Sequence, residues 1–354
     1  AIGGMSFDPK RKQSALWRKF QASQFIIPKY LFTEANGSYY LTVTVDVEPN
    51  DDLESFHTIF HQLDKHSVVR REVSQAKLNK REEKNKQSWM DVVKKAIHTL
   101  QIDEAQKIVL ARELQLSFDQ DVEISPLLEK LMDMQPNSYV FAFDFDETCF
   151  VGATPERLVK VSQQELLSTC LAGTAPRGDT KEKDEQIRLA LFQDRKNRSE
   201  HDHVVQMIKQ NIQHYCTNID IPEQPVVYTL KHLHHLYTPV KAELKDGFNI
   251  LDIVDRLHPT PALGGVPKQT SLAFIRNYEP MDRGWYGAPI GWMDSQQNGE
   301  FVVAIRSGLI RGREATLFAG CGIMEDSDPK MEYEETNIKF LPMLTALEAD
   351  YETY

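Results

Sequence analysis

The sequence predicts an α+β or mixed α/β fold that contains antiparallel sheets. Three observations support this prediction. Short apolar patches alternate with period two, helical patterns lie between them, and the two do not follow a regular βαβ rhythm. No internal repeat is present, and 354 residues can bury a large core as one big domain or two ordinary ones.

Period-two alternation indicates strands that bury one face and expose the other. In chain order the predicted strands are 25–32, 39–47, 139–145, 148–153, 157–162, 225–230, 288–294, 301–310 and 315–323. Apolar residues at helical spacing predict helices at 89–101, 123–134, 182–216, 248–257, 270–277 and 329–350. The charged segment 71–88 has no apolar stripe and is interpreted as a solvated helix or loop.

The first residues, AIGGMSFDP, lack an initiator Met and have the character of an apolar, Gly-containing strand entered midway. We interpret the chain as N-terminally shortened or cleaved, with a tag remnant as the alternative.

Composition restricts the possible partners. The formal net charge is −11, which argues against a general affinity for nucleic acid or an anionic membrane. An anionic ligand would therefore need specific basic residues to hold it. The four cysteines are far apart, in neither metal-binding nor disulfide spacing, which is typical of a reducing cytosol. No apolar run approaches the roughly 20 residues that span a bilayer, and no signal peptide is visible.

The segment DPKMEYEETNIK (328–339) concentrates negative charge at a predicted helix start. Asp328 is a candidate N-cap, and Pro329 suits the first helical position. Glu332, Glu335 and Lys339 are spaced i, i+3, i+7 and share one face. This face is either a solvated stripe or a site. A further carboxylate, Glu200, ends the apolar stripe of another predicted helix and is either a ligand or the partner of a neighbouring lysine.

Two strand segments suggest an anion site. In FVVAIRSGLI (301–310) alternation places Arg306 beside small residues, where its fork can bind a carboxylate; an edge-strand arginine in solvent is the alternative. In the segment Gly320–Gly322 the glycines let the backbone approach a ligand, or simply bend the chain.

Two further charged residues are candidate site residues. Glu156 follows Pro155, and this stiff turn holds its carboxylate in a fixed direction. Lys107 lies at the mouth of an apolar stretch, and a solvated lysine is the alternative. The histidines of KHLHHLYTP are interpreted as structural: His232 and His234 share a strand face, His235 points away, and no acid or cysteine completes a zinc site.

Taken together, these motifs resemble the chorismate-utilising enzymes over almost the whole chain. The matching segments occur in the family's order: KIVLAREL, FVGATPERLV, LAGTAPRG, SEHDHVV, HLYTPVKAEL, LHPTPALGGVPK, RGWYGAPIGW, FVVAIRSGLI and AGCGIMEDSDPKMEYEET. The resemblance implies one chorismate-binding catalytic domain over 1–354, with antiparallel sheets packed together and helices outside. Related chains have more sequence before the Gly-Gly strand, which also implies a shortened N-terminus.

Within this family, lysine at 107 with alanine at 172 is similar to the branch that adds water, and HPTPALGG from His258 resembles the isochorismate synthases. Members that make anthranilate differ at the first position, and members that make aminodeoxychorismate carry lysine at the second. Cys321 and Cys170 stand where alanine and proline are common in the family. Neither should block the chemistry, but both could make the enzyme sensitive to thiol reagents.

The resemblance implies that water enters at C2 of chorismate and the C4 hydroxyl leaves. Lys107 would be the general base toward water, and Glu156 the general acid with a raised pKa. Glu200 and Glu335 would bind Mg²⁺ directly and Glu332 through water, anchoring the ring carboxylate of the substrate. The implied substrate contacts are Gly173, Thr174, His258, Tyr286, Arg306, Gly320, Cys321, Gly322 and Lys339.

Two other functions stay open at the level of sequence. A salicylate synthase would share the fold and the metal and would eliminate pyruvate in a further step. A non-catalytic chorismate-binding module belongs to a different class. Sequence does not decide between menaquinone and siderophore pathways, and it does not reveal the oligomeric state.

Overall fold

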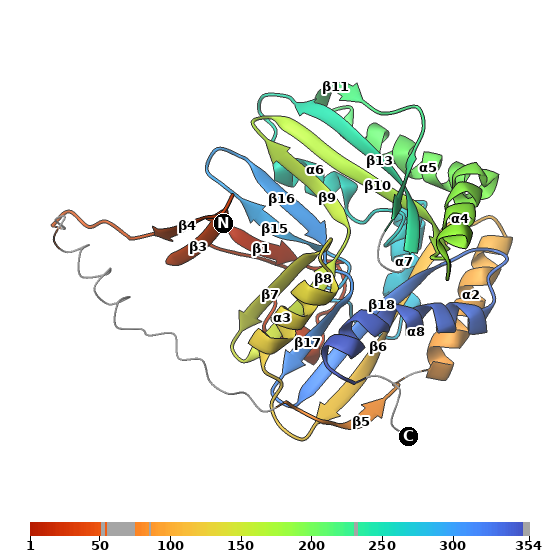
Figure 1. Cartoon of the computed structure of the whole chain (residues 1–354), viewed down its shortest axis with the longest axis horizontal. Helices are drawn as coiled ribbons and strands as arrows, with labels where there is room; N and C mark the ends of the chain where they lie inside the picture. The colour runs from red at the N-terminus through yellow and green to blue at the C-terminus, as the bar shows by residue number, and fades with distance from the viewer. Residues whose placement is uncertain (51–53, 55–74, 85, 230–232, 350–354) are drawn as a thin grey trace.

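Two antiparallel sheets form the frame of the protein, and helices cover their outer faces (Figure 1). This computed structural model describes residues 1–50, 54, 75–84, 86–229 and 233–349, apart from the side chain of Glu200. The predicted single domain of mixed helix and antiparallel sheet is confirmed. Within the described residues, no helix is both long and apolar enough to cross a bilayer.

The first sheet carries one wall of the site and is covered by three helices. In spatial order its strands are β11 (Cys216–Asp220), β13 (Leu233–Leu244), β10 (Glu165–Pro176), β9 (Arg157–Ser162), β16 (Gly299–Val303), β15 (Pro289–Met293), β1 (Ile2–Met5) and β2 (Ser23–Ile26), with β12 (Val226–Thr229) paired to β13. The helices α4 (Lys181–Gln193), α5 (Arg195–Ile212) and α6 (Ile250–Leu257) pack on it.

The second sheet carries the opposite wall. Its strands in spatial order are β14 (Gly265–Val266), β6 (Lys107–Phe118), β18 (Glu314–Ile323), β17 (Ser307–Arg311), β8 (Thr148–Thr154) and β7 (Tyr139–Phe145), with β5 (Leu78–Glu82) paired to β6. Its helices are α2 (Lys86–Gln101), α3 (Ile124–Met134), α7 (Lys268–Tyr278) and α8 (Pro329–Ala346). Figure 1 shows α8 crossing in front of β18 and β6.

Aromatic side chains from both sheets form one buried cluster and hold the sheets together. Trp17, in the short 3₁₀ helix η1 (Ala15–Trp17), stacks on Phe318 of β18 at a centroid distance of 5.4 Å. Phe20 contacts Trp285 edge-to-face at 5.2 Å. Such pairs add to the free energy of burying their area. By contrast, the hairpin of β3 (Tyr30–Ala35) and β4 (Ser38–Val43) projects from the body beside the N-terminus (Figure 1).

Several predicted elements match the structure, and others need correction. Strands β7 and β9 cover 139–145 and 157–162 as predicted. The single helix predicted at 182–216 is wrong, because Asp194 ends α4 and its carboxylate accepts from the Asn197 amide to cap α5. The described part of 71–88 contains an edge strand, β5, and the start of α2; residues 71–74 and 85 lie outside the described residues.

The predicted strand 301–310 also needs correction. It is two strands, β16 and β17, which belong to different sheets. The three longest strands, β6, β10 and β13, were not among the predicted ones, because charged and small residues interrupt their apolar alternation.

Candidate active site

A cavity of about 480 Å³ lies where both sheets meet α8. Its lining includes seven residues that sequence analysis proposed as site residues: Glu156, Thr174, Tyr286, Arg306, Gly320, Glu335 and Lys339. These residues come from six separate segments between positions 156 and 339, so the fold brings them together.

Glu156 and Arg306 both lie where the chain passes from one sheet to the other. Glu156 stands between β8 and β9, and Arg306 stands between β16 and β17. The two crossings are joined by backbone hydrogen bonds: Val303 N donates to Glu156 O at 3.0 Å, and Ala153 N donates to Arg306 O at 3.1 Å. These paired crossings hold both side chains in the wall of the cavity.

The backbone of Arg306 adopts an unusual conformation. Its φ is 52°, in the left-handed region that residues other than glycine rarely enter. The simple strand alternation predicted for 301–310 is therefore wrong at this position, although the expected anion-facing arginine is present in the cavity wall. A strained residue held by the surrounding structure often marks a functional site.

The pKa of the Glu156 carboxyl group depends on its burial and on the cations around it. Burial raises the pKa of the Glu156 carboxyl to about 7, and the nearby charges of Arg306, Lys107 and Lys339 oppose that rise. Near pH 7 this carboxyl group is therefore protonated in a large fraction of the molecules. Burial lowers the pKa of the Arg306 guanidinium, while Tyr286, Glu335 and Glu156 raise it. A protonated carboxyl group close to cations is suited to donate a proton to a leaving oxygen.

Lys107 approaches the same space from the first residue of β6. Its carbonyl oxygen accepts a 2.9 Å hydrogen bond from Ser271 Oγ, and its backbone pairs with Val266 of β14. Its side chain crosses Gly322, where an added Cβ would lie 2.6 Å from Lys107 Cε and 3.4 Å from Nζ. Lys107 is not among the residues that line the cavity, but its charge acts on Glu156.

Helix α8 presents the acidic face predicted from its sequence. The Asp328 carboxylate accepts from the amides of Lys330 and Met331, which confirms the N-cap with Pro329 in the first turn. Lys339 Nζ donates to Glu335 Oε1 at 2.6 Å and to Gly320 O at 2.8 Å. Glu335, Ile338 and Lys339 of this helix line the cavity. The acidic face therefore borders a cavity and is not only a solvated stripe.

Glu332 has the features of a carboxylate that is suited to bind a cation. One oxygen, Oε1, accepts from Ser327 Oγ at 2.6 Å, while Oε2 is buried without a hydrogen-bond partner among the described residues. Burial raises the pKa of this carboxyl group, and the Cys321 thiol lies beside it. A buried carboxylate oxygen that has only a weak thiol donor beside it, one turn from Glu335, fits an oxygen-ligated cation such as Mg²⁺.

The third predicted ligand, Glu200, lies within α5, but its side chain is outside the described residues. Among the residues that are described, no group of three or more His, Cys, Asp or Glu side chains could hold a metal ion. The neighbouring Lys196 Nζ lies 3.7 Å from a carboxylate oxygen of Asp326. The complete ligand set therefore stays a prediction.

A bulge in β10 shapes the floor of the cavity. The register with β13 shifts between Ala172 and Thr174, and Gly173 between them has a φ of 78°. Glycine adopts this conformation at little cost, and the bulge turns the Thr174 side chain toward the cavity. Thr174 Oγ1 lies 3.0 Å from Nδ1 of His235.

His235 was interpreted as structural, and the structure corrects this. The side chain lines the cavity beside Arg306, and burial lowers its pKa to about 4, so it is neutral at pH 7. His234 is structural, since its Nε2 lies 2.9 Å from Asp184 Oδ1, and His232 lies outside the described residues. Strand alternation predicted that His234 and His235 point to opposite faces, but only the pairing of His235 with Thr174 in the assembled sheet shows that its face lines the cavity.

Four predicted substrate contacts are not among the residues that line the cavity: Gly173, His258, Cys321 and Gly322. His258 is not among the lining residues; its Nε2 donates to Phe7 O at 3.0 Å, and burial lowers its pKa to about 4. The Cys321 side chain is 1% exposed and is adjacent to Glu332, so only its backbone could reach a substrate. The expected reactivity of Cys321 and Cys170 is not supported, because both thiols are buried.

Arg283 also lines the cavity, although it was not among the predicted site residues. The Arg283 guanidinium forms a buried bidentate pair with Glu279 at 2.7 and 2.6 Å and donates to Leu263 O at 2.9 Å. Glu279 Oε2 also accepts from Ala111 N at 2.7 Å. In the sequence, the i, i+4 spacing of Glu279 and Arg283 was the signal that could have identified this pair. Both charges of the pair are satisfied within the protein, so its role is structural.

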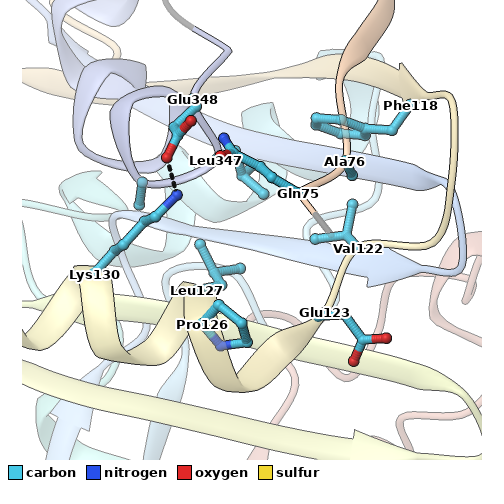
Figure 2. Close-up of a pocket in the computed structure, with 11 residues that line it drawn as sticks. Gln75, Ala76, Phe118, Val122, Glu123, Pro126, Leu127, Lys130, Leu347 and Glu348 are labelled. Atoms are coloured by element: carbon cyan, nitrogen blue, oxygen red, sulfur yellow. Dashed lines mark hydrogen bonds and ion pairs between the residues drawn. The ribbon is translucent and has the colours of Figure 1, made fainter. Parts of the chain in front are cut away.

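A smaller cavity of about 210 Å³ lies apart from this site, between α3 and the end of α8. Figure 2 shows its largely apolar wall and the ion pair of Lys130 with Glu348 at its rim. None of the predicted site residues lines it. Seven of the predicted site residues instead line the larger cavity.

Comparison with known proteins agrees with this geometry. Residues 1–348 match the family described as "Chorismate binding enzyme". The chain is 44% identical over 348 residues to "Isochorismate synthase MenF" of Bacillus subtilis, covering 98% of this chain and 74% of that protein. It is 34% identical over 353 residues to "Salicylate biosynthesis isochorismate synthase" of Pseudomonas aeruginosa, with coverage of 98% and 74%. The solved structure of the menaquinone-specific isochorismate synthase MenF from Escherichia coli superposes with a TM-score of 0.87 at 27% identity, covering 98% of this chain and 78% of that one.

Proposed function

Because the chain belongs to the chorismate binding enzyme family, we propose that it is an isochorismate synthase, an isomerase that converts chorismate to isochorismate. The observation that carries this proposal is the placement of Glu156, a largely buried carboxyl group with a pKa of about 7, within the electrostatic reach of Lys107 and Arg306. A proton donor opposite an amine suits the exchange of one hydroxyl group for another.

In the proposed reaction a water oxygen bonds to C2 of the ring and the C4–oxygen bond breaks, while the two ring double bonds shift. Lys107 is the proposed base that accepts a proton from the attacking water. Glu156, in its protonated form, donates a proton to the departing C4 oxygen, so that water leaves. One water enters and one leaves, and the net result is isomerisation.

The anionic substrate needs cationic partners in an acidic protein. Arg306 and Lys339 both line the cavity and are placed to bind carboxylates, and neutral Tyr286 and His235 offer hydrogen bonds. The backbone of Gly320–Gly322 and the Gly173–Thr174 bulge complete the proposed contacts. Arginine suits this task because its planar fork binds a carboxylate through two parallel hydrogen bonds.

Mg²⁺ is the proposed cofactor, held by Glu335 and Glu200 directly and by Glu332 through water. When bound, it would supply positive charge that orients the ring carboxylate of the substrate. The orphaned Oε2 of Glu332 supports this assignment. The four thiols have no disulfide partners, which supports placing the reaction in a reducing cytosol.

Product analysis tests the proposal directly. Purified protein is incubated with chorismate and Mg²⁺ in H₂¹⁸O, and the products are separated by chromatography and weighed by mass spectrometry. Isochorismate with one ¹⁸O is expected, and Lys107→Ala, correctly folded by circular dichroism, should form none. Near-normal turnover by Lys107→Ala would remove the lysine from the mechanism.

The same assay separates the rivals. Accumulation of salicylate without an added lyase would identify a salicylate synthase. Chorismate binding by calorimetry without turnover would identify a non-catalytic module. One matched structure is named a menaquinone-specific isochorismate synthase, and one relative is named a salicylate biosynthesis isochorismate synthase.

A further inference from the structure

Strand β6 carries two basic side chains with different tasks. Lys107 at its start reaches toward the catalytic cavity, and Arg112 lies five residues later. Positions an odd number apart leave a strand on opposite faces. Arg112 accordingly points to the outer side of the sheet, where α8 packs, and is only 4% exposed.

The Arg112 guanidinium contacts four residues of α8. Nε donates to Thr336 Oγ1 at 2.7 Å, and Nη2 donates to Asn337 Oδ1. The guanidinium carbon also lies 4.1 Å from the ring centroid of Tyr333 and 4.8 Å from that of Phe340. A buried cation between two ring faces is a favourable and directional contact.

The contacted residues form one stripe of α8. Positions 333, 336, 337 and 340 are spaced i, i+3, i+4 and i+7, which places them on one face. The residues assigned to the metal and the substrate, Glu332, Glu335 and Lys339, each come directly before a contacted residue. Neighbouring positions on a helix differ by about 100° in direction. The orientation of the stripe therefore sets the direction in which the acidic face points.

The geometry fixes α8 along its axis as well as around it. Tyr333 and Phe340 are two turns apart and lie on either side of the guanidinium, so a shift of one residue, about 1.5 Å, would displace both rings and both hydrogen bonds. Tyr333 is held further, since its hydroxyl donates to Glu83 and the Lys86 ammonium lies 4.2 Å from its ring centroid.

From these contacts we infer that Arg112 is a positioning residue that sets the rotation and axial position of α8, and with them the placement of Glu332, Glu335 and Lys339 at the cavity. Strand β6 then determines the distance between the amine at 107 and the carboxylates of the helix. The inference rests on the proposed function for the roles of those three side chains.

The test compares Arg112→Met, which removes the fork but keeps apolar bulk, with Leu344→Ala as the matched control. Leu344 is a fully buried residue of α8, two turns beyond Thr336, and contributes to packing at the other end of the helix. Mn²⁺, a paramagnetic stand-in for Mg²⁺, is titrated by electron paramagnetic resonance. KM and kcat for chorismate and the thermal unfolding midpoint are measured in parallel.

For Arg112→Met we expect at least tenfold weaker Mn²⁺ binding and at least tenfold higher KM, with a smaller loss in kcat at saturating metal and substrate. Leu344→Ala should lower the unfolding midpoint without changing Mn²⁺ affinity beyond twofold. Should Arg112→Met fail to fold, Thr336→Val, which removes the acceptor of Nε at constant shape, is expected to weaken Mn²⁺ binding about threefold.

Two results would overturn the inference: unchanged Mn²⁺ affinity in the folded Arg112 or Thr336 variants, or an equal loss in Leu344→Ala, which would indicate a general packing effect. A wild-type chain that binds Mn²⁺ but leaves chorismate unchanged would refute the proposed function alone, because the metal titration still reports the position of α8.

Discussion

The side chain of Lys107 lies across Gly322 so closely that a Cβ at position 322 would approach Cε to 2.6 Å. The two residues are on neighbouring strands, β6 and β18, where Gly322 pairs with Val109. A side chain at 322 would therefore force the lysine to shift from its present path toward Glu156. This relationship connects a glycine, predicted as a backbone contact, to the position of the proposed base.

Gly322→Ala should therefore impair catalysis without unfolding the protein. The added methyl group must push the lysine stem aside, and displaced proton-transfer groups commonly lose 10²–10⁴-fold of their contribution, so a loss of about 100-fold in kcat is expected. Stopped assays of chorismate turnover measure it. Thr316→Ala, on the same strand but away from the cavity, serves as the control. Unchanged kcat in Gly322→Ala would show that the lysine reaches its place by another route.

The pH dependence should reflect Glu156. Its pKa of about 7 is raised by burial, so the carboxyl group is protonated below pH 7 and ionised above it. Because the proposed acid acts in the protonated form, kcat should fall as pH rises through about 7. Glu156→Gln should lose most activity and also lose this alkaline limb. A profile that stays flat from pH 6 to 9 would contradict the assignment.

The same shift affects stability. The folded-state pKa lies above the ordinary value, so the stabilising preference for the protonated form is complete below pH 4.5 and is lost as pH rises through about 7. Denaturant titrations of wild type and Glu156→Gln should diverge over this window. Relative to wild type, the glutamine variant should become more stable as pH increases.

Arg306 allows stability and function to be separated. Its φ of 52° costs an ordinary residue roughly 1–2 kcal/mol, which glycine avoids, although glycine also gains freedom in the unfolded chain. Arg306→Gly should therefore change the free energy of unfolding by no more than about 1 kcal/mol, while kcat/KM falls at least 100-fold. Arg306→Lys keeps the charge without the fork and should be intermediate. A stable, fully active glycine variant would remove the arginine from substrate binding.

Turnover should require a divalent metal ion that the carboxylates of α8 bind. Excess EDTA should abolish turnover, and added Mg²⁺ should restore it. Glu335→Gln should raise the Mg²⁺ concentration for half-maximal activity at least tenfold, because a neutral amide is a weaker ligand. Glu334→Gln is the control, since Glu334 is exposed and lies on another face of the helix. Full activity in excess EDTA would exclude the metal role.

The cysteines should be inert in the folded protein. All four are buried, and burial raises the pKa of the thiols of Cys149, Cys216 and Cys321. Thiol reagents should leave activity unchanged under native conditions and label all four groups in denaturant. Rapid native labelling with loss of activity would restore the sensitivity expected from sequence.

The sequence by itself determined the class of fold, the cap and acidic face of α8, and the candidate proton-transfer residues, because these depend on local patterns and on motifs that are contiguous in the chain. The break at Asp194 is also a local feature, because its carboxylate caps α5 through the amide of Asn197, three residues later. Only the tertiary structure decided the position of His235 at the cavity and the left-handed turn at Arg306. Each of these depends on contacts between segments far apart in sequence: a bulge against β13, or two crossings between sheets joined by hydrogen bonds. The local periodicity of a sequence contains no information about such distant partners. The direction of a side chain at a sheet crossing is therefore decided only by the assembled fold.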